Sequence, residues 1–134
     1  MYILDTNVIS EMRKPRPHGA VKAWVSSLSD VQIFISAVTL GEIQSGIERT
    51  RRQDPEKAAM LDGWAAELLE TQSILPMDGL AFREWARLMH GRPVQLVQDA
   101  MIAATARVHS LTIATRNVRD FESFDVKVYN PFGN

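Results

Sequence analysis

Short apolar runs alternate along the chain with longer segments whose apolar residues recur at helical spacing. The apolar runs predict strands at residues 2–4, 32–38, 73–77, 111–114 and 126–129. The helically spaced segments predict helices at residues 6–12, 20–27, 40–51, 55–70 and 98–109, and a further helix that Asp78 caps. Strands that alternate with helices favour an α/β layer fold with a mostly parallel sheet.

Proline and glycine separate these segments without dividing the chain into parts. Gly91-Arg92-Pro93 predicts a loop, and residues 115–125 predict a second loop between the last two strands. The chain shows no internal repeat, low-complexity segment or linker, and its 134 residues fit one domain. We therefore expect a single domain over residues 1–134.

Net charge, cysteine content and the N-terminal residues indicate the environment in which the protein acts. The net charge of -1 provides no strong overall field, so any contact with RNA has to come from local basic patches. The chain has no cysteine, which excludes disulfides, thiolate nucleophiles and cysteine-bound zinc and fits a reducing cytosol. The first residues do not resemble a signal peptide and no apolar stretch would span a membrane, so we expect a cytoplasmic protein.

Acidic residues stand near the expected carboxyl ends of the strands, where open parallel sheets bind ligands. Asp5 directly follows the first strand, Glu42 lies four residues past the second, and Asp120 lies in the loop after the fourth. Asp99 opens a helix, and its spacing alone leaves open whether it lies at the same edge.

Converging carboxylates repel one another, and this repulsion raises their pKa values unless a cation intervenes. Magnesium binds such oxygen ligands together with substrate phosphates, and it can activate water against a phosphodiester. The sequence contains no serine-hydrolase elbow, phosphate-binding loop or histidine pair at ligand spacing.

Each acid also has a purely structural interpretation. Thr39-Leu40-Gly41-Glu42 matches a capping box, and Asp99 in a first helical turn is favoured by the helix dipole. Asp120 would suit a turn, and Asp5 would cap the following helix. Asp5 fits the structural interpretation least well, because it stands directly after a buried strand.

Four segments resemble the PIN-domain family, and more narrowly the VapC toxins of toxin–antitoxin pairs in their FitB-like branch. The segments keep the family's order and spacing and cover the chain from end to end: residues 1–11, 35–43, 99–106 and 111–121. The resemblance implies a three-layer α/β/α sandwich with a five-stranded, mostly parallel sheet. It also implies an endoribonuclease that depends on Mg²⁺, or alternatively Mn²⁺, and leaves a 5′-phosphate.

The resemblance assigns Asp5, Glu42 and Asp99 directly to the family's catalytic, metal-binding acids. This chain has Asn117 where many members have an aspartate, so we assign the fourth position to Asp120 and keep Asn117 as a further ligand. Thr6 and Thr115 are supporting hydroxyls. The resemblance also implies a cognate antitoxin, a homodimer, and transfer or ribosomal RNA as substrate.

Basic residues near the acids are expected to contact RNA phosphates. Arg116 is nearer the acids than the other basic sets and is the best single candidate, and Arg13, Lys14 and Arg16 follow the first helix. Arg49, Arg51 and Arg52 end the third helix. Both sets are explained about equally well by phosphate contacts and by a solvated surface with favourable charge at a helix end.

Two other functions fit the sequence. One is a PIN-like module that has the same fold and binds RNA or a protein but does not cleave RNA. A phosphoryl-accepting signalling domain would use Asp5, but it needs a lysine at a later strand end, and none stands there.

Overall fold

The computed structural model describes residues 1–133, and Asn134 of the expected domain lies outside the described residues. Its strands are β1 Tyr2–Leu4, β2 Ile33–Ser36, β3 Ser73–Leu75, β4 Thr112–Ala114 and β5 Val128–Tyr129. Its helices are α1 Thr6–Arg13, α2 Gly19–Ser26, α3 Ala37–Arg51, α4 Pro55–Thr71, α5 Gly79–Met89, α6 Val97–His109 and α7 Val118–Glu122. Short 3₁₀ turns lie at Asp30–Gln32 and Val94–Leu96. The predicted cap of α5 is confirmed, since Asp78 accepts the Ala81 N–H at 3.0 Å.

The sheet has the strand order β3-β2-β1-β4-β5, and every pairing in it is parallel. The chain moves outward from β1 through β2 to β3, and then returns to the other side of β1 as β4. Strand order therefore reverses between β1 and β4. In open α/β sheets, the carboxyl ends of the strands at this reversal form the crevice in which ligands bind.

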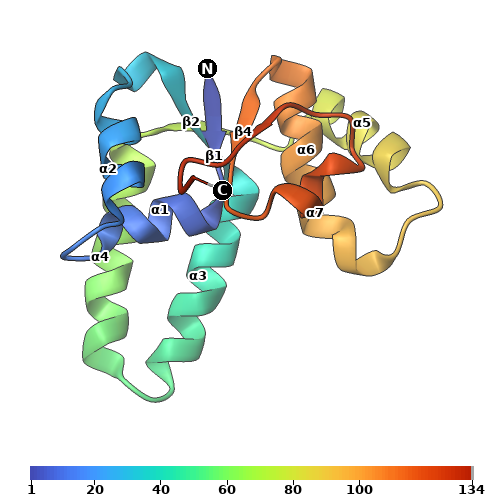
Figure 1. Ribbon diagram of the computed structural model, residues 1–134. Helices are drawn as coiled ribbons and strands as arrows, with labels where there is room; N and C mark the ends of the chain where they lie inside the picture. Colours follow the sequence, from blue (N-terminus) through green and yellow to red (C-terminus); the bar gives the residue numbers. More distant parts are fainter. Residues whose placement is uncertain (134) are drawn as a thin grey trace.

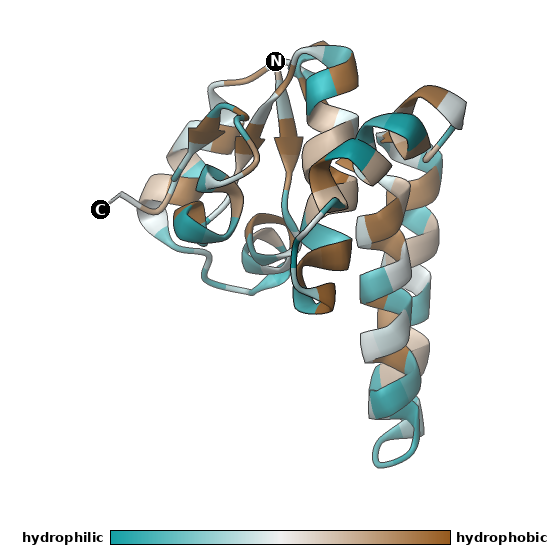
Figure 2. Cartoon of the chain, turned by 90° about the vertical axis from the view of Figure 1, so that its right-hand side faces the viewer, coloured by the Kyte–Doolittle hydropathy of each residue, from teal (hydrophilic) through white to brown (hydrophobic). Residues whose placement is uncertain are grey.

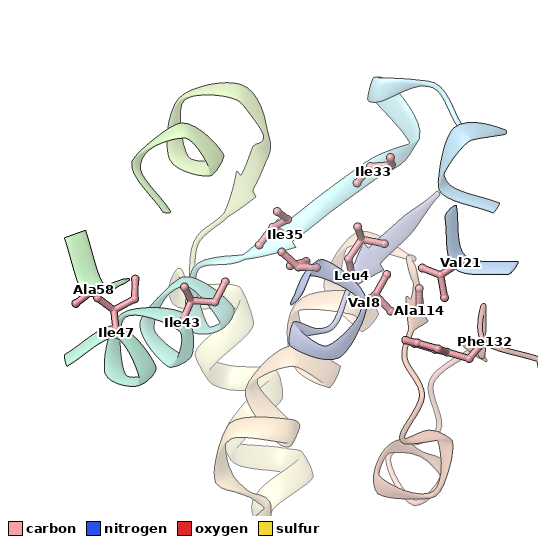
Figure 3. Close-up of a cluster of buried hydrophobic side chains, with 11 residues drawn as sticks. Leu4, Val8, Val21, Ile33, Ile35, Ile43, Ile47, Ala58, Ala114 and Phe132 are labelled. Carbon is pink, nitrogen blue, oxygen red and sulfur yellow. The ribbon is translucent and has the colours of Figure 1, made fainter. Parts of the chain in front are cut away.

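Alternate residues of the central strands face opposite cores, as a sheet buried on both faces requires. Leu4 of β1 packs with α1, α2, α3 and α4, whereas Ile3 packs with α5, α6 and α7. Figure 3 shows the first core, where Ile33 and Ile35 of β2 lie beside Val8 of α1. Helices thus cover both sides of the sheet (Figure 1), and the predicted three-layer sandwich is confirmed.

Most element boundaries differ from the prediction by one to three residues; for example, β3 ends at Leu75 instead of residue 77, and β5 begins at Val128 instead of residue 126. Two larger differences bear on the site. The strand predicted at residues 32–38 ends at Ser36, because the Ser36 hydroxyl accepts the Val38 N–H at 3.1 Å and starts α3. The loop predicted at residues 115–125 contains α7, which is held by the buried ring of Phe121. A five-residue helix with one buried residue is too short for its apolar spacing to be recognised.

Helices α3 and α4 project from the sheet as an antiparallel pair with a hydrophilic tip (Figure 2). Arg51 holds the pair together, since its guanidinium contacts Glu48 at 3.0 Å and Asp62 of α4 at 2.5 Å. This arrangement favours a structural role for Arg51 over a contact with RNA.

Helix α6 lies close to the sheet because its inner face is built from small residues. Ala100, Ala103 and Ala106 are completely buried, and the carbonyl of Val97 accepts the indole N–H of Trp85 from α5 at 3.1 Å. The helix begins at the carboxyl edge of the sheet (Figure 1), so its first turn brings Asp99 to that edge. Among the described helices, none is both long and apolar enough to cross a membrane.

The hydrogen bond from the Trp85 indole to the Val97 carbonyl is expected to stabilise the packing of α5 against α6. Trp85→Phe keeps an aromatic ring against Phe82 but removes the indole donor to Val97. We expect the free energy of unfolding to fall by about 1 kcal/mol, measured by urea denaturation. Phe82→Leu, which leaves the indole donor in place, is the matched control, and an unchanged stability for Trp85→Phe would contradict the role of this bond.

Candidate active site

Asp5 joins the end of β1 to the start of α1. Its backbone N–H continues the sheet by donating to the carbonyl of Ala114 at 2.9 Å. Its side chain is only 7% exposed, and one carboxylate oxygen, Oδ1, accepts the Thr6 N–H at 2.8 Å. The predicted capping role of Asp5 is therefore real, and it leaves the second oxygen for other partners.

Thr115 holds that second oxygen from the neighbouring strand. It directly follows β4, is completely buried, and donates its hydroxyl to Asp5 Oδ2 at 2.8 Å. The same hydroxyl accepts the Asn117 N–H at 3.0 Å. This buried contact ties the carboxyl ends of β1 and β4 together at the point where strand order reverses.

Asn7 completes this network, although sequence reasoning did not select it. Its amide nitrogen lies 3.2 Å from Thr115 Oγ1 and 3.4 Å from Asp5 Oδ2, and its amide oxygen accepts the Arg116 N–H at 3.1 Å. The available signal was its position two residues after Asp5 at a strand–helix junction, where an amide can both donate and accept.

Glu42 lies in the second turn of α3 and accepts the Thr6 hydroxyl at 3.1 Å. The capping-box interpretation of residues 39–42 is wrong, because α3 begins after Ser36 and Thr39 is a buried residue within the helix. Burial raises the pKa of Glu42, repulsion from Asp5 adds to this rise, and the Thr6 hydrogen bond opposes it. Glu42 is therefore not needed to start its helix, and it faces another acid.

Asp99 lies within electrostatic reach of all the other predicted acids. Burial raises its pKa to about 6, and repulsion from Asp5, Asp120 and Glu42 contributes to this value. The pKa of Asp5 is raised by burial and by Asp120, against the hydrogen bonds from Thr115 and Thr6. The structure thus gathers Asp5, Glu42, Asp99 and Asp120, which are separated by up to 115 residues, in one charged cluster.

Asp120 and Asn117 lie on the exposed side of this cluster. Asn117 precedes α7, Asp120 lies in its first turn, and both line a hollow with Arg116, Arg119 and Asn130. Helix α7 therefore places Asp120 on the solvent side of the buried Asp5.

The acid cluster offers oxygen donors of the kind that a divalent cation prefers. Within residues 1–133, no three acidic, histidine or cysteine side chains form a preformed ligand group. The chemistry of the donors fits a hard cation all the same, because carboxylate oxygens are its preferred ligands and like charges here raise one another's pKa. A bound cation would relieve the repulsion that the fold imposes on these acids.

The predicted RNA-binding residues differ in their surroundings. The guanidinium of Arg116 lies 3.7 Å from the centre of the Phe132 ring, and that of Arg13 lies 5.6 Å from the Trp64 ring. Lys14 is paired at 3.0 Å with the buried Glu11, so part of its charge is already balanced. Arg116 is the one of these three whose backbone belongs to the hydrogen-bond network around Asp5.

Comparison with known proteins agrees with this geometry. The PIN domain family matches residues 2–127. The chain belongs to the PIN-domain family. It is 37% identical to toxin FitB of Neisseria gonorrhoeae, covering 98% of this chain and 99% of that protein. It is 33% identical to VapC ribonuclease Y4jK of Sinorhizobium fredii, covering 98% of both chains.

Solved structures show the same relationship. The crystal structure of FitAcB from Neisseria gonorrhoeae superposes with a TM-score of 0.86 at 35% identity and covers 100% of both chains. A structure of FitAB bound to an IR36 DNA fragment superposes with a TM-score of 0.85 at 34% identity, covering all of this chain and 97% of the other. The resemblance to PIN domains and to the FitB-like branch is thereby confirmed.

The raised pKa of Asp99 predicts how this PIN domain responds to pH without metal. Because its pKa of about 6 in the folded state lies above 3.8, the folded protein holds the proton more tightly. The resulting stabilisation is complete below about pH 3.8 and is lost as pH rises through about 6. At pH 8 with EDTA, we expect Asp99→Asn to be about 1–2 kcal/mol more stable than wild type, since solvent screens part of the repulsion.

Urea denaturation at pH 8 and at pH 4 measures this difference, which should shrink at the lower pH. Glu70→Gln, an exposed change in α4, is the control and should alter stability little at either pH. Equal destabilisation by Asp99→Asn at both pH values would show that the acid is structural.

Proposed function

We propose that this PIN-domain protein is an endoribonuclease that hydrolyses RNA phosphodiester bonds and acts as the toxin of a toxin–antitoxin pair. The main observation behind the proposal is that four acids lie together where the strand order reverses. Their burial and mutual repulsion raise the pKa of Asp99 to about 6. The relatives named VapC ribonuclease and toxin FitB, which match over nearly the whole chain, support it.

Magnesium, or manganese in its place, is the proposed cofactor. Asp5 and Asp99 would hold it, and Glu42 and Asp120 would ligate directly or through water, with Asn117 as a further oxygen donor. When bound, the cation supplies Lewis acidity toward a phosphodiester oxygen and lowers the pKa of an attacking water. No nucleophilic side chain is required, which agrees with the absence of cysteine.

The chain's own residues orient the acids for this chemistry. Thr115 and Asn7 fix one oxygen of Asp5, and the Thr6 N–H fixes the other. The Thr6 hydroxyl directs Glu42 toward the same cluster. Because these donors hold Asp5 and Glu42 in place, the two acids need little reorganisation on binding substrate.

Arg116 is the proposed phosphate contact nearest the acids, supported by Arg13 and Lys14. The Phe132 ring packs against the guanidinium of Arg116 from beneath and limits its motion, leaving its donors for phosphate oxygens. Transfer or ribosomal RNA is the proposed substrate class, and the cytoplasm is the proposed site of action.

An antitoxin is the proposed protein partner. The similar structures named FitAB and FitAcB are complexes, and the FitAB structure includes DNA. This chain has an apolar groove between α1, α2 and α4, which suits the apolar face of a partner helix. The lining includes Leu4, Ile9, Met12, Val25, Leu28 and Leu68. A homodimer is the proposed state of the free toxin.

Asp5 tests the proposed chemistry directly. Asp5→Asn keeps the shape of the side chain and removes its charge, so we expect at least a 100-fold loss of RNA cleavage, on the order of one major transition-state contact. Cleavage of labelled transfer RNA with Mg²⁺, and its loss in EDTA, is the measurement. Glu70→Gln should cut at the wild-type rate.

Retained cleavage in Asp5→Asn or in EDTA would contradict the proposal. If wild-type protein binds RNA but never cuts it, the non-cleaving PIN-like module is the better description.

Arg116 gives a separate test of substrate binding. Arg116→Ala should lower the slope of log affinity against log salt by about 0.7, the value for one phosphate contact to a single strand. Fluorescence anisotropy with labelled RNA in EDTA measures this slope without cleavage. Arg87→Ala on α5, whose guanidinium pairs with Glu84, is the control. A slope unchanged from wild type would exclude the contact.

A further inference from the structure

Residues of α1, α3 and α4 line a recess beside the acid cluster. Figure 1 shows how these three helices are arranged. Each helix contributes residues at spacings of four and three, which places them on one face. The three stripes are Thr6, Ser10 and Arg13 of α1, Glu42, Gly46 and Arg49 of α3, and Lys57, Leu61 and Trp64 of α4.

The charge of the recess changes along its length, from acidic at its inner end to basic further out. At its inner end, the Thr6 hydroxyl donates to Glu42, so the recess opens directly onto the acid cluster. Two helical turns further along α3 stands Arg49, about 10 Å away at 1.5 Å per residue. The recess therefore leads from the proposed cleavage site to a group of cations on three different helices.

These cations are not neutralised by carboxylates. Among the ion pairs of residues 1–133, none includes Arg13, Arg49 or Lys57, although Arg51 in the next turn is paired twice. All three residues are exposed. Because all three line one recess, a polyanion that enters it would meet three unpaired cations.

Arg49 is turned along the recess rather than away from it. A Cβ at Gly46 would stand 3.6 Å from Arg49 Nη2, so the guanidinium lies back over the glycine toward Glu42. Arg49 also lines the adjoining hollow with Thr6, Glu42, Ser45 and Gln98. The absence of a side chain at Gly46 leaves this part of the recess open.

We infer that this recess binds the phosphates of the RNA strand next to the bond that is cut, with Arg13, Arg49 and Lys57 as the contacts. The inference rests on the proposed ribonuclease function and extends it by assigning a path to the flanking strand. Arg116 lies in the hollow that contains Asp120, whereas the recess adjoins Glu42. A strand crossing the acids would thus meet cations in both places.

RNA fits the recess better than the antitoxin does. The apolar groove proposed for the antitoxin shares Arg13 and Trp64 with the recess and lies between α1, α2 and α4. That groove offers mainly aliphatic side chains, whereas the recess joins exposed cations to the acid cluster. Charge complementarity therefore favours a polyanion in the recess.

Binding of a short fluorescein-labelled single-stranded RNA tests the inference. Anisotropy is measured over a series of KCl concentrations in EDTA, so that no cleavage occurs. Arg13→Gln, Arg49→Gln and Lys57→Gln should each lower the slope of log affinity against log salt by about 0.7, and the triple variant by about 2. Arg49→Lys should retain the wild-type slope.

Two exposed cations outside the recess serve as controls of equal charge. Arg83 lies on α5 and Lys22 lies on α2, and Arg83→Gln and Lys22→Gln should both keep the wild-type slope. Recess variants that match the controls, or wild-type protein that binds no RNA, would overturn the inference. So would variants that weaken binding of an oligoglutamate peptide while binding RNA normally, since they would indicate a site for an acidic protein.

Cleavage in Mg²⁺ is measured separately on the same variants. Protein that binds RNA through the recess without ever cutting it would overturn the proposed ribonuclease function and leave the assignment of the recess intact. Protein that cuts RNA while the recess variants behave like the controls would support the ribonuclease function and overturn the assignment of the recess.

Discussion

The buried hydrogen bond from Thr115 to Asp5 joins two strand ends that are adjacent in the sheet but 110 residues apart in the chain. Both residues directly follow their strands, so the parallel pairing of β1 with β4 places them side by side. A carboxylate this deeply buried is unfavourable unless its oxygens are bonded, and Thr6, Asn7 and Thr115 supply the donors. The rest of the acid cluster is arranged around an Asp5 that cannot turn away.

Glu42 and Asp99 reach Asp5 because two helices start at the same edge of the sheet. Helix α3 brings Glu42, and the alanine-rich α6 lies close enough to the sheet to bring Asp99. Burial raises the pKa of Glu42 and of Asp99, and repulsion among the acids adds to this rise, so holding the ionised acids together lowers the stability of the fold. Acids whose pKa values are raised in this way are typical of functional sites.

Helix α4 borders two different surfaces, and Trp64 lines both of them. One is the apolar groove against α1 and α2, and the other is the recess with Arg13, Arg49 and Lys57. Because Arg13 packs on the Trp64 ring, one contact forms part of both walls. Occupants of the two surfaces therefore meet at the same pair of side chains, which gives a physical route by which a protein partner can influence RNA binding.

The sequence alone determined the α/β class, the five strands and the positions of the acids, because apolar periodicity and residues that follow strands depend on local order. It also carried the resemblance to PIN domains through four segments in register. It did not reveal α7, which is held by a single buried ring, Phe121. Nor did it reveal the network of Asn7, because its partners Thr115 and Arg116 lie more than 100 residues away.

Only the tertiary structure decided whether Asp99 joins the other acids, because that depends on how closely α6 packs on the sheet. It also decided that Glu42 is not a cap, since the start of α3 is set by Ser36 at the end of β2. The charges of Arg49 and Arg51 could not be told apart by sequence. Their difference arises because Asp62 of α4 reaches Arg51, while Arg49 faces the recess beside Gly46.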